Sequence, residues 1–413
     1  MAAPKETYTP AFSSKSKPHI STGIPFPEAC AHHINNTFHS SKVYIIVSNS
    51  ISKTSNFSSL NECLGNLVVG VRYGIKPHTP WDDILEIVND MREKEADIIV
   101  TLGAGSLTDG AKLISFALAN NVSNRAELYS LSAEVKTPNL KPCQIPIINI
   151  PTSLSGGEYS PFAGATNTLS HQKVSFRHPS MGASLVILSP SLCVSTPQHI
   201  WLSTGIRAVD HCVEGLCSLD QKVCAESDEE FSRALRLLVP NLLITKKDPM
   251  NEKARLKEMW GVVEAMKALD KGIPMGGSHG IGHQLGPLGV GHGETSCIML
   301  PPVLKYNAKH GGQNKKVIEG QNKVLKVLWE EATVREVLEK SGLKKEDSDA
   351  GDALGAIVNE LGMPRSLKDV GVGKEQLDAL AENCLKDRWL PTNPVPLTSK
   401  EQVLKVLEMA SGS

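Results

Sequence analysis

The feature that most limits how this chain can fold is an alternation of short apolar runs with helical patterns in its first half. Continuous apolar runs occur at residues 43–47, 67–71, 97–102, 145–150 and 185–188. Runs of this length, rich in Val and Ile, are typical of strands that are buried on both faces. Helical periodicity fills residues 80–96 and 106–119. The alternation predicts an α/β domain with a parallel sheet and helices on both of its faces.

From about residue 195 the pattern changes to helix-length amphipathic segments, at residues 228–239, 251–269, 323–340 and 374–385. This change predicts a second domain that is all-α. A chain of 413 residues is also too long for one ordinary hydrophobic core. We therefore expect a flexible N-terminal tail over residues 1–25, an α/β nucleotide-binding domain over 26–192 and an all-helical domain over 193–413.

Composition excludes several classes of function. The formal net charge is −1, and acidic and basic residues are interspersed, so neither a nucleic-acid partner nor a membrane surface is expected. The nine cysteines are scattered without a CxxC pair, which is typical of reduced thiols inside cells. The sequence has neither a run long enough to span a membrane nor a secretory signal. We expect a cytoplasmic protein that acts on a small-molecule substrate.

Three histidines lie close together in the second half of the chain. His279 and His283 are four residues apart, so a helix would carry them on one face, and His292 follows shortly after. A fourth, His211, lies in another helical segment. A lone histidine is more often structural, but this spacing favours a functional site. Converging imidazoles can bind a transition metal or donate a proton near neutral pH.

Two glycine-containing loops follow predicted strands in the first half. Residues 103–112, GAGSLTDGAK, leave a strand and open a helix, whose N-terminal N–H groups could bind a pyrophosphate. This loop lacks the GxGxxG fingerprint, which disfavours a standard Rossmann site. The second loop, residues 151–161, offers hydroxyl groups and glycines after the next strand. Two such loops at the ends of parallel strands would face one crevice.

These segments resemble a known family. GAGSLTDGAK resembles the GGGSxxDxAK loop of the iron-containing (group III) alcohol dehydrogenases, and HGIGHQLG at 279–286, followed by GHG, resembles their histidine signature. PTSLSGGEYSPFAGATN at 151–167 and HGETSCIMLPPVLKYN at 292–307 are similar to segments of the maleylacetate reductases within that superfamily. The resemblance implies a dehydroquinate synthase-like architecture, NAD(H) or NADP(H) as cofactor, and a homodimer.

The resemblance also assigns cofactor-binding residues. Gly103, Ala104, Gly105, Ser106 and Asp109 would lie along the pyrophosphate, and Thr152 and Ser153 would lie near the nicotinamide. Lys173 would bond to the ribose, although it could equally be a solvated surface lysine. Asn49 stands where many relatives place an Asp that repels a 2′-phosphate, so NADPH stays open beside NADH.

The clearest departure from the family lies at the metal site. Relatives bind Fe²⁺ or Zn²⁺ with an Asp, a His four residues later, and two further histidines. Here His211, His279 and His292 are present, and they would be the ligands if a metal were bound. The position four residues before His211 is Arg207, whose guanidinium has no free lone pair and repels a cation. Asp210 could substitute, but it lies about 100° around the helix from His211. We therefore expect no catalytic metal, with Fe or Zn as the alternative.

The residues then receive roles in a metal-free reaction. We expect NAD(P)H-dependent, maleylacetate reductase-like hydride transfer to a small, anionic keto or enoyl substrate. Arg207 would anchor a carboxylate or stabilise negative charge, unless it only pairs with Glu214 or Glu158. His283 would donate the proton, and His211, His279 and His292 would bind substrate oxygen atoms.

Two other functions remain open at this point. One is an Fe- or Zn-dependent alcohol dehydrogenase. The other is a non-redox dehydratase or isomerase of a biosynthetic pathway, which the departures Ala104, Arg207 and Gly291 would permit.

Overall fold

The structure is a computed structural model that describes residues 5–76, 78–170 and 172–412. It divides into two compact units, Met1–Ser195 and Thr196–Ser413. The division falls three residues beyond the boundary expected from the sequence, because the short helix α6 (Pro190–Cys193) belongs to the first unit. Each unit is described separately below.

The first unit is built on a seven-stranded sheet with the strand order β1-β2-β9-β6-β5-β3-β4. Neighbouring strands are parallel apart from the antiparallel pair β1 and β2. The strands are β1 Thr7–Pro10, β2 His19–Thr22, β3 Val43–Val47, β4 Val68–Tyr73, β5 Ile98–Gly103, β6 Ile147–Pro151 and β9 Leu185–Ile187. The predicted parallel sheet is confirmed, and all five predicted runs contribute a strand.

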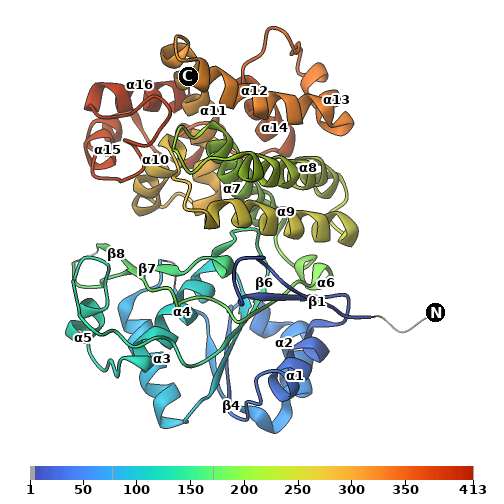
Figure 1. Cartoon of the computed structure of the whole chain (residues 1–413), viewed down its shortest axis with the longest axis vertical. Coiled ribbons are helices and arrows are strands. Elements are labelled where there is room, and N and C mark those ends of the chain that lie inside the picture. Colours follow the sequence, from blue (N-terminus) through green and yellow to red (C-terminus); the bar gives the residue numbers. More distant parts are fainter. Residues whose placement is uncertain (1–4, 77, 171, 413) are drawn as a thin grey trace. The chain divides into compact units, whose positions relative to one another are not determined.

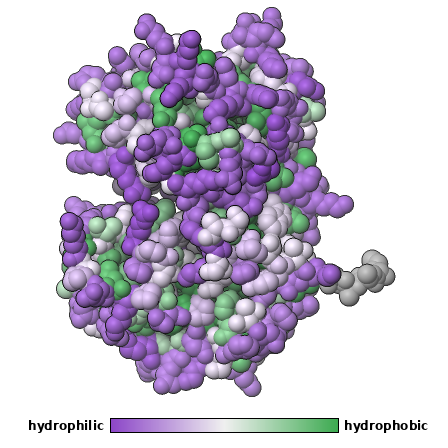
Figure 2. Space-filling model, in the orientation of Figure 1, coloured by the Kyte–Doolittle hydropathy of each residue, from purple (hydrophilic) through white to green (hydrophobic). Residues whose placement is uncertain are grey.

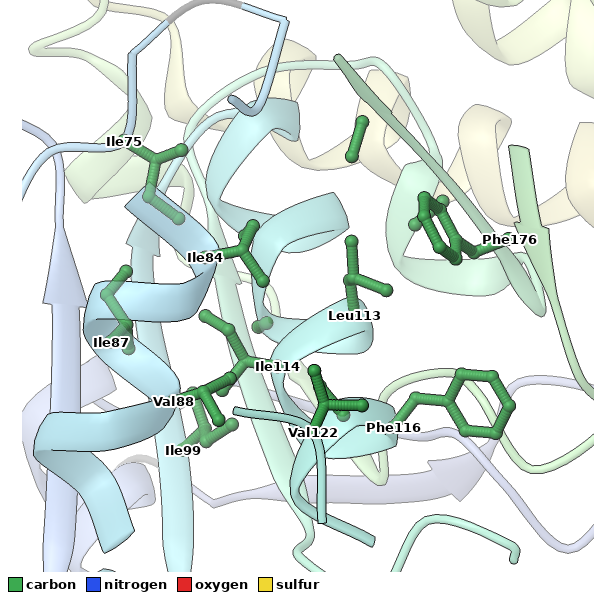
Figure 3. Close-up of a cluster of buried hydrophobic side chains, with 14 of the residues drawn as sticks. Ile75, Ile84, Ile87, Val88, Ile99, Leu113, Ile114, Phe116, Val122 and Phe176 are labelled. Carbon is green, nitrogen blue, oxygen red and sulfur yellow. The ribbon is translucent and has the colours of Figure 1, made fainter. Parts of the chain in front are cut away.

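Helices cover both faces of this sheet. Two of them, α3 (Trp81–Glu93) and α4 (Gly105–Ala119), lie on one face, and α1 (Phe26–Asn36) and α2 (Ser55–Leu64) lie on the other (Figure 1). Each pair closes its own hydrophobic core against the strands. In Figure 3, Val88 of α3 lies against Ile114 of α4 above Ile99 of β5. The short helix α5 (Arg125–Ser130) and the hairpin β7–β8 (Phe162–Thr166 and Lys173–Arg177) complete the unit.

The expectation of a flexible tail over residues 1–25 is wrong for most of that segment. Residues 7–10 and 19–22 form β1 and β2, and β2 pairs in parallel with β9. Ile20 and Ser21 are fully buried, and the ring of Tyr8 stacks on that of His19. Residues 1–4 lie outside the described part of the chain. The composition of this segment could not reveal its pairing with a strand more than 160 residues away.

The second unit consists of helices, as expected. They are α7 Gln198–Cys217, α8 Ala225–Lys247, α9 Glu252–Asp270, α10 Gly277–Leu285, α11 His292–Gly311, α12 Lys315–Glu330, α13 Ala332–Lys340, α14 Ala350–Leu361, α15 Leu377–Cys384 and α16 Lys400–Ala410. Several begin at side-chain caps: Asn251, Asp349 and Ser399 each accept a hydrogen bond from a backbone N–H in the first turn.

One predicted helix is in fact two. The segment 323–340 is broken at Glu331, which has an extended backbone with φ −79° and ψ 115°. The carboxylate of Glu331 accepts a hydrogen bond from Arg236 of α8 at 3.1 Å. That tertiary contact accompanies the break, which helical periodicity alone did not reveal.

The face of the molecule in Figure 2 is mostly hydrophilic, with apolar residues in small separate areas. Among the described residues, no helix combines the length and the apolar character needed to cross a membrane.

Candidate active site

The loop after β5 has the geometry of an anion-binding turn. The strand ends at Gly103 and α4 begins at Gly105, and the N-cap residue between them, Ala104, has no side-chain acceptor. No N-cap side chain therefore bonds to the first N–H groups of this 15-residue helix, and the N–H of Leu107 donates to the carbonyl of Ala104 at 3.0 Å. Gly103 has φ +156°, and a Cβ there would lie 2.5 Å from Leu107 Cδ1. The backbone turns sharply into the helix at this position, and glycine suits the turn because it has no Cβ.

The second loop lies beside the first. Strands β5 and β6 are parallel neighbours, and the amide N–H of Thr152 donates to the carbonyl of Gly103 at 3.1 Å. Thr152 and Ser153 are each only 5 % exposed. A Cβ on Gly105 would lie 3.7 Å from Ser155 Oγ, in ordinary contact. The structure thus brings the two predicted loops together at the carboxyl edge of the sheet.

Asp109 and Lys173 meet around Gly164 of β7. Asp109 pairs with the buried Lys112 at 2.8 Å, and its other oxygen accepts the N–H of Gly164 at 3.4 Å. Lys173 is exposed, but its Cε would lie 2.5 Å from a Cβ on Gly164, so its side chain runs across this glycine. Asp109 of α4 and Lys173 of β8 therefore both lie against Gly164.

Asn49 lies at a different strand end. It follows β3, is exposed, and its Nδ2 would lie 2.7 Å from a Cβ on Gly74. Gly74 has φ +80° and donates its N–H to the carbonyl of Val47 at 2.6 Å. The amide of Asn49 is thus packed over a glycine turn at the same edge of the sheet.

In the second unit, α10 carries His279 and His283 on one face, as predicted. Its glycines allow close packing on several sides. A Cβ on Gly280 would lie 2.2 Å from Leu390 Cδ1, and one on Gly282 would lie 2.9 Å from Thr295 Oγ1. Glycine weakens an isolated helix by about 1 kcal/mol per residue. Tertiary packing therefore holds α10 in place.

His279 is buried against two carboxyl groups of α7. Its Nδ1 lies 2.8 Å from Glu214 Oε2 and 3.4 Å from Asp210 Oδ2. Glu214 also accepts the backbone N–H groups of Gly276 and Ser278, each at 2.7 Å. The Nε2 of His279 has no hydrogen-bond partner among the described residues. One side of this imidazole is therefore fixed, and the other offers an unused nitrogen.

Arg207 is buried one turn before His211. It is 3 % exposed, its Nη1 donates to Ser296 Oγ at 3.1 Å, and it lies 3.8 Å from Asp210 Oδ2. The ion-pair partner is thus Asp210, in place of the Glu214 or Glu158 considered from the sequence. Asp210 also accepts hydrogen bonds from Ser278 and Ser296, at 2.8 and 2.5 Å. Burial raises the pKa values of both Asp210 and Glu214.

The imidazoles form two pairs. The rings of His211 and His279 have centroids 4.7 Å apart, and those of His283 and His292 are parallel at 6.4 Å. Burial lowers the pKa values of His211 and His279 well below the ordinary range, and the charge of Arg207 lowers both further. These two imidazoles are neutral near pH 7.

His283 has a different setting. Its side chain is 33 % exposed, and its Nδ1 lies 2.8 Å from Asp387 Oδ2. Asp387 Oδ1 also accepts the N–H of Trp389 at 2.9 Å, which fixes the carboxylate. His292 is exposed at the start of α11. A carboxylate on Nδ1 and partial exposure suit a histidine that exchanges protons.

The potential metal ligands near His279 already have partners within the protein. Among the described residues, only Asp210, Glu214 and His279 bring three ligand atoms within 4.8 Å of one another. Glu214 and His279 already bond to each other there, and the Arg207 guanidinium lies beside Asp210. The set His211, His279 and His292 is not brought together in this way. A cation would have to break existing bonds and approach a fixed positive charge.

Sequence reasoning missed two members of this site, Ser296 and Asp387, and considered Glu214 only as a partner of Arg207. Glu214 lies one turn after Asp210 on α7, and the sequence gave no sign of its contact with His279. Ser296 gave no signal of its own. Asp387 is 104 residues away from its partner His283, and no local pattern could link them.

Comparison with known proteins agrees with the fold and the motifs. The iron-containing alcohol dehydrogenase family matches residues 21–190, and the C-terminal model of the Fe-containing alcohol dehydrogenase family matches residues 201–411. Dehydrogenase FUM7 of Gibberella moniliformis is 41 % identical over 97 % of this chain and 98 % of its own. Dehydrogenase ALT3 of Alternaria alternata is 42 % identical over 90 % of this chain and all of its own.

More distant relatives include maleylacetate reductases. Maleylacetate reductase 1 of Cupriavidus pinatubonensis is 27 % identical over 81 % of this chain and 80 % of its own. The crystal structure of maleylacetate reductase from Rhizobium sp. strain MTP-10005 covers all of this chain and 99 % of its own, with a TM-score of 0.73 at 24 % identity. Sulfoacetaldehyde reductase from Bifidobacterium kashiwanohense, solved in complex with NAD+, covers 98 % of this chain and 99 % of its own, with a TM-score of 0.78 at 20 % identity.

The parallel-sheet unit and the helical unit match the folds of these solved structures. The chain belongs to the iron-containing alcohol dehydrogenase family. It is an oxidoreductase of that family.

Proposed function

We propose that this protein is an NAD(P)H-dependent reductase of the maleylacetate reductase-like branch, which reduces a small anionic keto or enoyl substrate without a catalytic metal. The observation that carries the proposal is the buried Arg207, which occupies the position one turn before His211 and supplies a fixed positive charge beside Asp210. A guanidinium can bind a carboxylate or stabilise developing negative charge, as a metal ion does in other enzymes.

The first unit would hold the dinucleotide. The open N-terminus of α4 and the glycines Gly103 and Gly105 suit a pyrophosphate, and Thr152 and Ser153 lie beside them. Lys173 and Asn49 would contact the two riboses. A bound reduced nicotinamide supplies the hydride from its C4 atom.

The second unit would bind the substrate and supply the proton. Arg207 would hold an anionic oxygen in a buried setting where its charge is little screened. His283, held by Asp387, would donate the proton and recover it from solvent. His211, His279 and His292 would line the substrate.

A combined measurement of metal content and turnover tests this proposal. NAD(P)H oxidation would be followed on maleylacetate and on a panel of small keto and aldehyde acids, before and after chelation, with metal measured by plasma mass spectrometry. We expect metal far below one equivalent and turnover that the chelator does not change. A full equivalent of Fe or Zn with chelator-sensitive turnover would overturn the metal-free reaction.

The variant Arg207→Lys tests whether Arg207 binds the substrate. Arg207→Lys keeps the positive charge but loses the two-pronged contact with a carboxylate. We expect KM for anionic substrates to rise about tenfold, whereas the matched surface variant Arg233→Lys should leave KM unchanged. An unchanged KM in Arg207→Lys would remove Arg207 from substrate binding.

Cofactor choice has a simple variant. Asn49→Asp would place a negative charge where a 2′-phosphate would lie, so binding of NADPH should weaken by about 2 kcal/mol relative to NADH. Fluorescence titration of the two reduced cofactors measures this difference.

We further propose that the protein is a homodimer and that it works in the cytoplasm. Analytical ultracentrifugation would test the first proposal, and cell fractionation would test the second.

A second candidate function rests on one observation. The ligand atoms of Asp210, Glu214 and His279 lie within 4.8 Å of one another. If these groups exchanged their present bonds for a cation, the enzyme would be an Fe- or Zn-dependent alcohol dehydrogenase. The measurement of metal content and chelator sensitivity separates these two candidates.

A non-redox function, as a dehydratase or isomerase, would be favoured if the protein neither bound nor oxidised NAD(P)H.

A further inference from the structure

A cavity in the first unit has no role in the proposed reaction. Its volume is about 340 Å³, and it is lined by the loop between β1 and β2 together with residues from 158–161 and 179–183. The β1–β2 loop lies beside the start of β9, because the N–H of His19 donates to the carbonyl of Ser184 at 3.0 Å. This part of the cavity is therefore at the amino edge of the sheet, whereas the glycine turn of α4 is at the carboxyl edge. Cavities of this size hold small organic ligands.

One wall of the cavity contains a carboxyl group that lacks a hydrogen-bond donor. Glu158 lines the cavity and is 2 % exposed, and its Oε1 is buried without a partner among the described residues. Buried polar atoms nearly always have a partner, because an unsatisfied one costs free energy. Burial also raises the pKa of this carboxyl to about 7. A donor that enters through the cavity would satisfy this oxygen.

Lys112, whose charge acts on Glu158, does not supply that donor. Its ammonium group pairs with Asp109 at 2.8 Å and donates to the carbonyl of Gly157 at 2.9 Å and to Ser160 Oγ at 3.3 Å. An ammonium group has three N–H donors, so these contacts use them all. Oε1 of Glu158 is thus left for a group that the described residues do not provide.

The other walls supply aromatic surface and positive charge. Phe12 and Tyr159 are 3 % and 6 % exposed, and their rings meet edge to face with centroids 6.3 Å apart. Lys15 is exposed, and its Nζ lies 5.7 Å from the centroid of the Phe12 ring. Lys17 is half-buried, and its Nζ donates to the carbonyl of Ser180 at 2.9 Å. That single bond leaves Lys17 able to bind an anion as well.

We propose that this cavity is a ligand site for a small carboxylic acid that also carries an ammonium or hydroxyl group, as amino acids and hydroxy acids do. The N–H or O–H of the ligand donates to Oε1 of Glu158, and its carboxylate pairs with Lys15 and Lys17. Its apolar part lies against Phe12 and Tyr159. The site is independent of the proposed function, since none of the residues assigned to hydride or proton transfer lines the cavity.

Matched probes test which groups the cavity recognises. Isothermal titration calorimetry of the full chain would use alanine, leucine and phenylalanine, each beside three analogues: the hydroxy acid, the acid without the donor, and the amine without the carboxylate. We expect an amino acid or a hydroxy acid to bind at least about tenfold more tightly than both stripped analogues of its skeleton, because each loses one hydrogen-bonded contact. The two donor-bearing series show whether the site prefers ammonium or hydroxyl. Equal binding of the acid without the donor, or no binding by either donor-bearing series, would overturn the proposal.

Variants locate the binding in this cavity. Lys15→Gln should weaken binding about tenfold, whereas Lys136→Gln, at another exposed position of the first unit, should leave it unchanged. Glu158→Leu should remove the preference for the donor-bearing acid, and circular dichroism would show whether this variant folds. Lys15 is exposed, so Lys15→Gln gives a result even if Glu158→Leu does not fold.

The variant Arg207→Lys separates this site from the proposed substrate site. It should leave the affinity for the amino or hydroxy acid unchanged, because Arg207 belongs to the second unit and the cavity to the first. Affinity that falls in Arg207→Lys but not in Lys15→Gln would place the ligand in the substrate site and overturn the proposal. A chain that oxidises no NAD(P)H but binds the acid as expected would contradict the proposed function and leave this site standing.

Discussion

The two histidines of α10 differ in their partners although they lie one turn apart. His279 is 3 % exposed and contacts Glu214 and Asp210, while the side chain of His283 is 33 % exposed and contacts Asp387. The first imidazole is kept neutral by burial and by Arg207. The second can reach solvent. The comparison teaches that one helix can place two histidines in different settings, one buried and one partly exposed, because the depth of burial changes within a single turn.

The largest effect on turnover is expected for the variant His283→Gln. Glutamine keeps a polar side chain at this half-exposed position but cannot carry a proton at neutral pH. We expect kcat to fall about 10²- to 10⁴-fold with little change in melting temperature. Exposed His199→Gln on α7 is the control and should keep full activity. Activity within twofold of the wild type in His283→Gln would mean that another group donates the proton.

His279→Gln should lower stability more, and turnover less, than His283→Gln does. It removes the hydrogen bond between the imidazole and the buried Glu214 of α7, which costs about 1–3 kcal/mol of the free energy of unfolding. We expect kcat/KM to fall about tenfold to a hundredfold, through an altered pocket. Urea unfolding and steady-state kinetics measure the two effects. A larger loss of kcat than in His283→Gln, at unchanged stability, would reverse the assigned roles.

Asp387→Asn tests whether a carboxylate matters at the exposed histidine. Asparagine keeps the shape, but it does not stabilise the imidazolium that forms when His283 takes a proton. We expect kcat to fall about tenfold and the pH midpoint of the activity profile to move to lower pH. The exposed variant Asp347→Asn should leave both unchanged. An unmoved profile in Asp387→Asn would show that the contact only holds the 387–390 turn.

The smallest effect on turnover is expected at Glu258. This carboxyl is buried but bonds to Trp201 and Thr245, so its variant shows the effect of burial without a histidine partner. Burial raises the pKa of this carboxyl from 4.5 to about 7. The folded protein therefore binds one more proton than the unfolded chain between these values, so its stability falls as pH rises from 4.5 to about 7. The contribution is at most about 3 kcal/mol, at 1.36 kcal/mol per pKa unit. Glu258→Gln should flatten this part of the curve of unfolding free energy against pH, and an unchanged slope would contradict the assignment.

Sequence could predict the parts of the fold in which burial on both faces makes a segment almost entirely apolar. The strands β3, β5 and β6 are dense in Val, Ile and Leu because both of their faces are buried. Strands β1 and β7 are partly exposed, so they carry no such density. Each pairs with the next strand in the chain, β1 with β2 and β7 with β8, so their mixed composition is what hid them from sequence analysis.

The same division holds within the site. The histidines of α10 could be placed from helical spacing, and the loop of Gly103 from its glycine and the following helix. The carboxylates that set the chemistry of these histidines come from α7 and from residue 387, at separations of 65 and 104 residues. Sequence spacing placed the two rings on one helix but did not reveal the carboxyl groups that contact them.

The glycine-rich packing of α10 has a consequence for the order of synthesis. The N–H of Gly277 donates to Asn393 Oδ1, and Gly280 is pressed against Leu390, more than a hundred residues later in the chain. On the ribosome, the segment that carries His279 and His283 emerges well before residues 387–393. A nascent chain that stopped after residue 385 would contain His211, His279, His283 and His292 but would lack Asp387, Leu390 and Asn393, which contact α10. A premature stop codon near the 3′ end of the message would therefore remove these contacts without removing any of the four histidines.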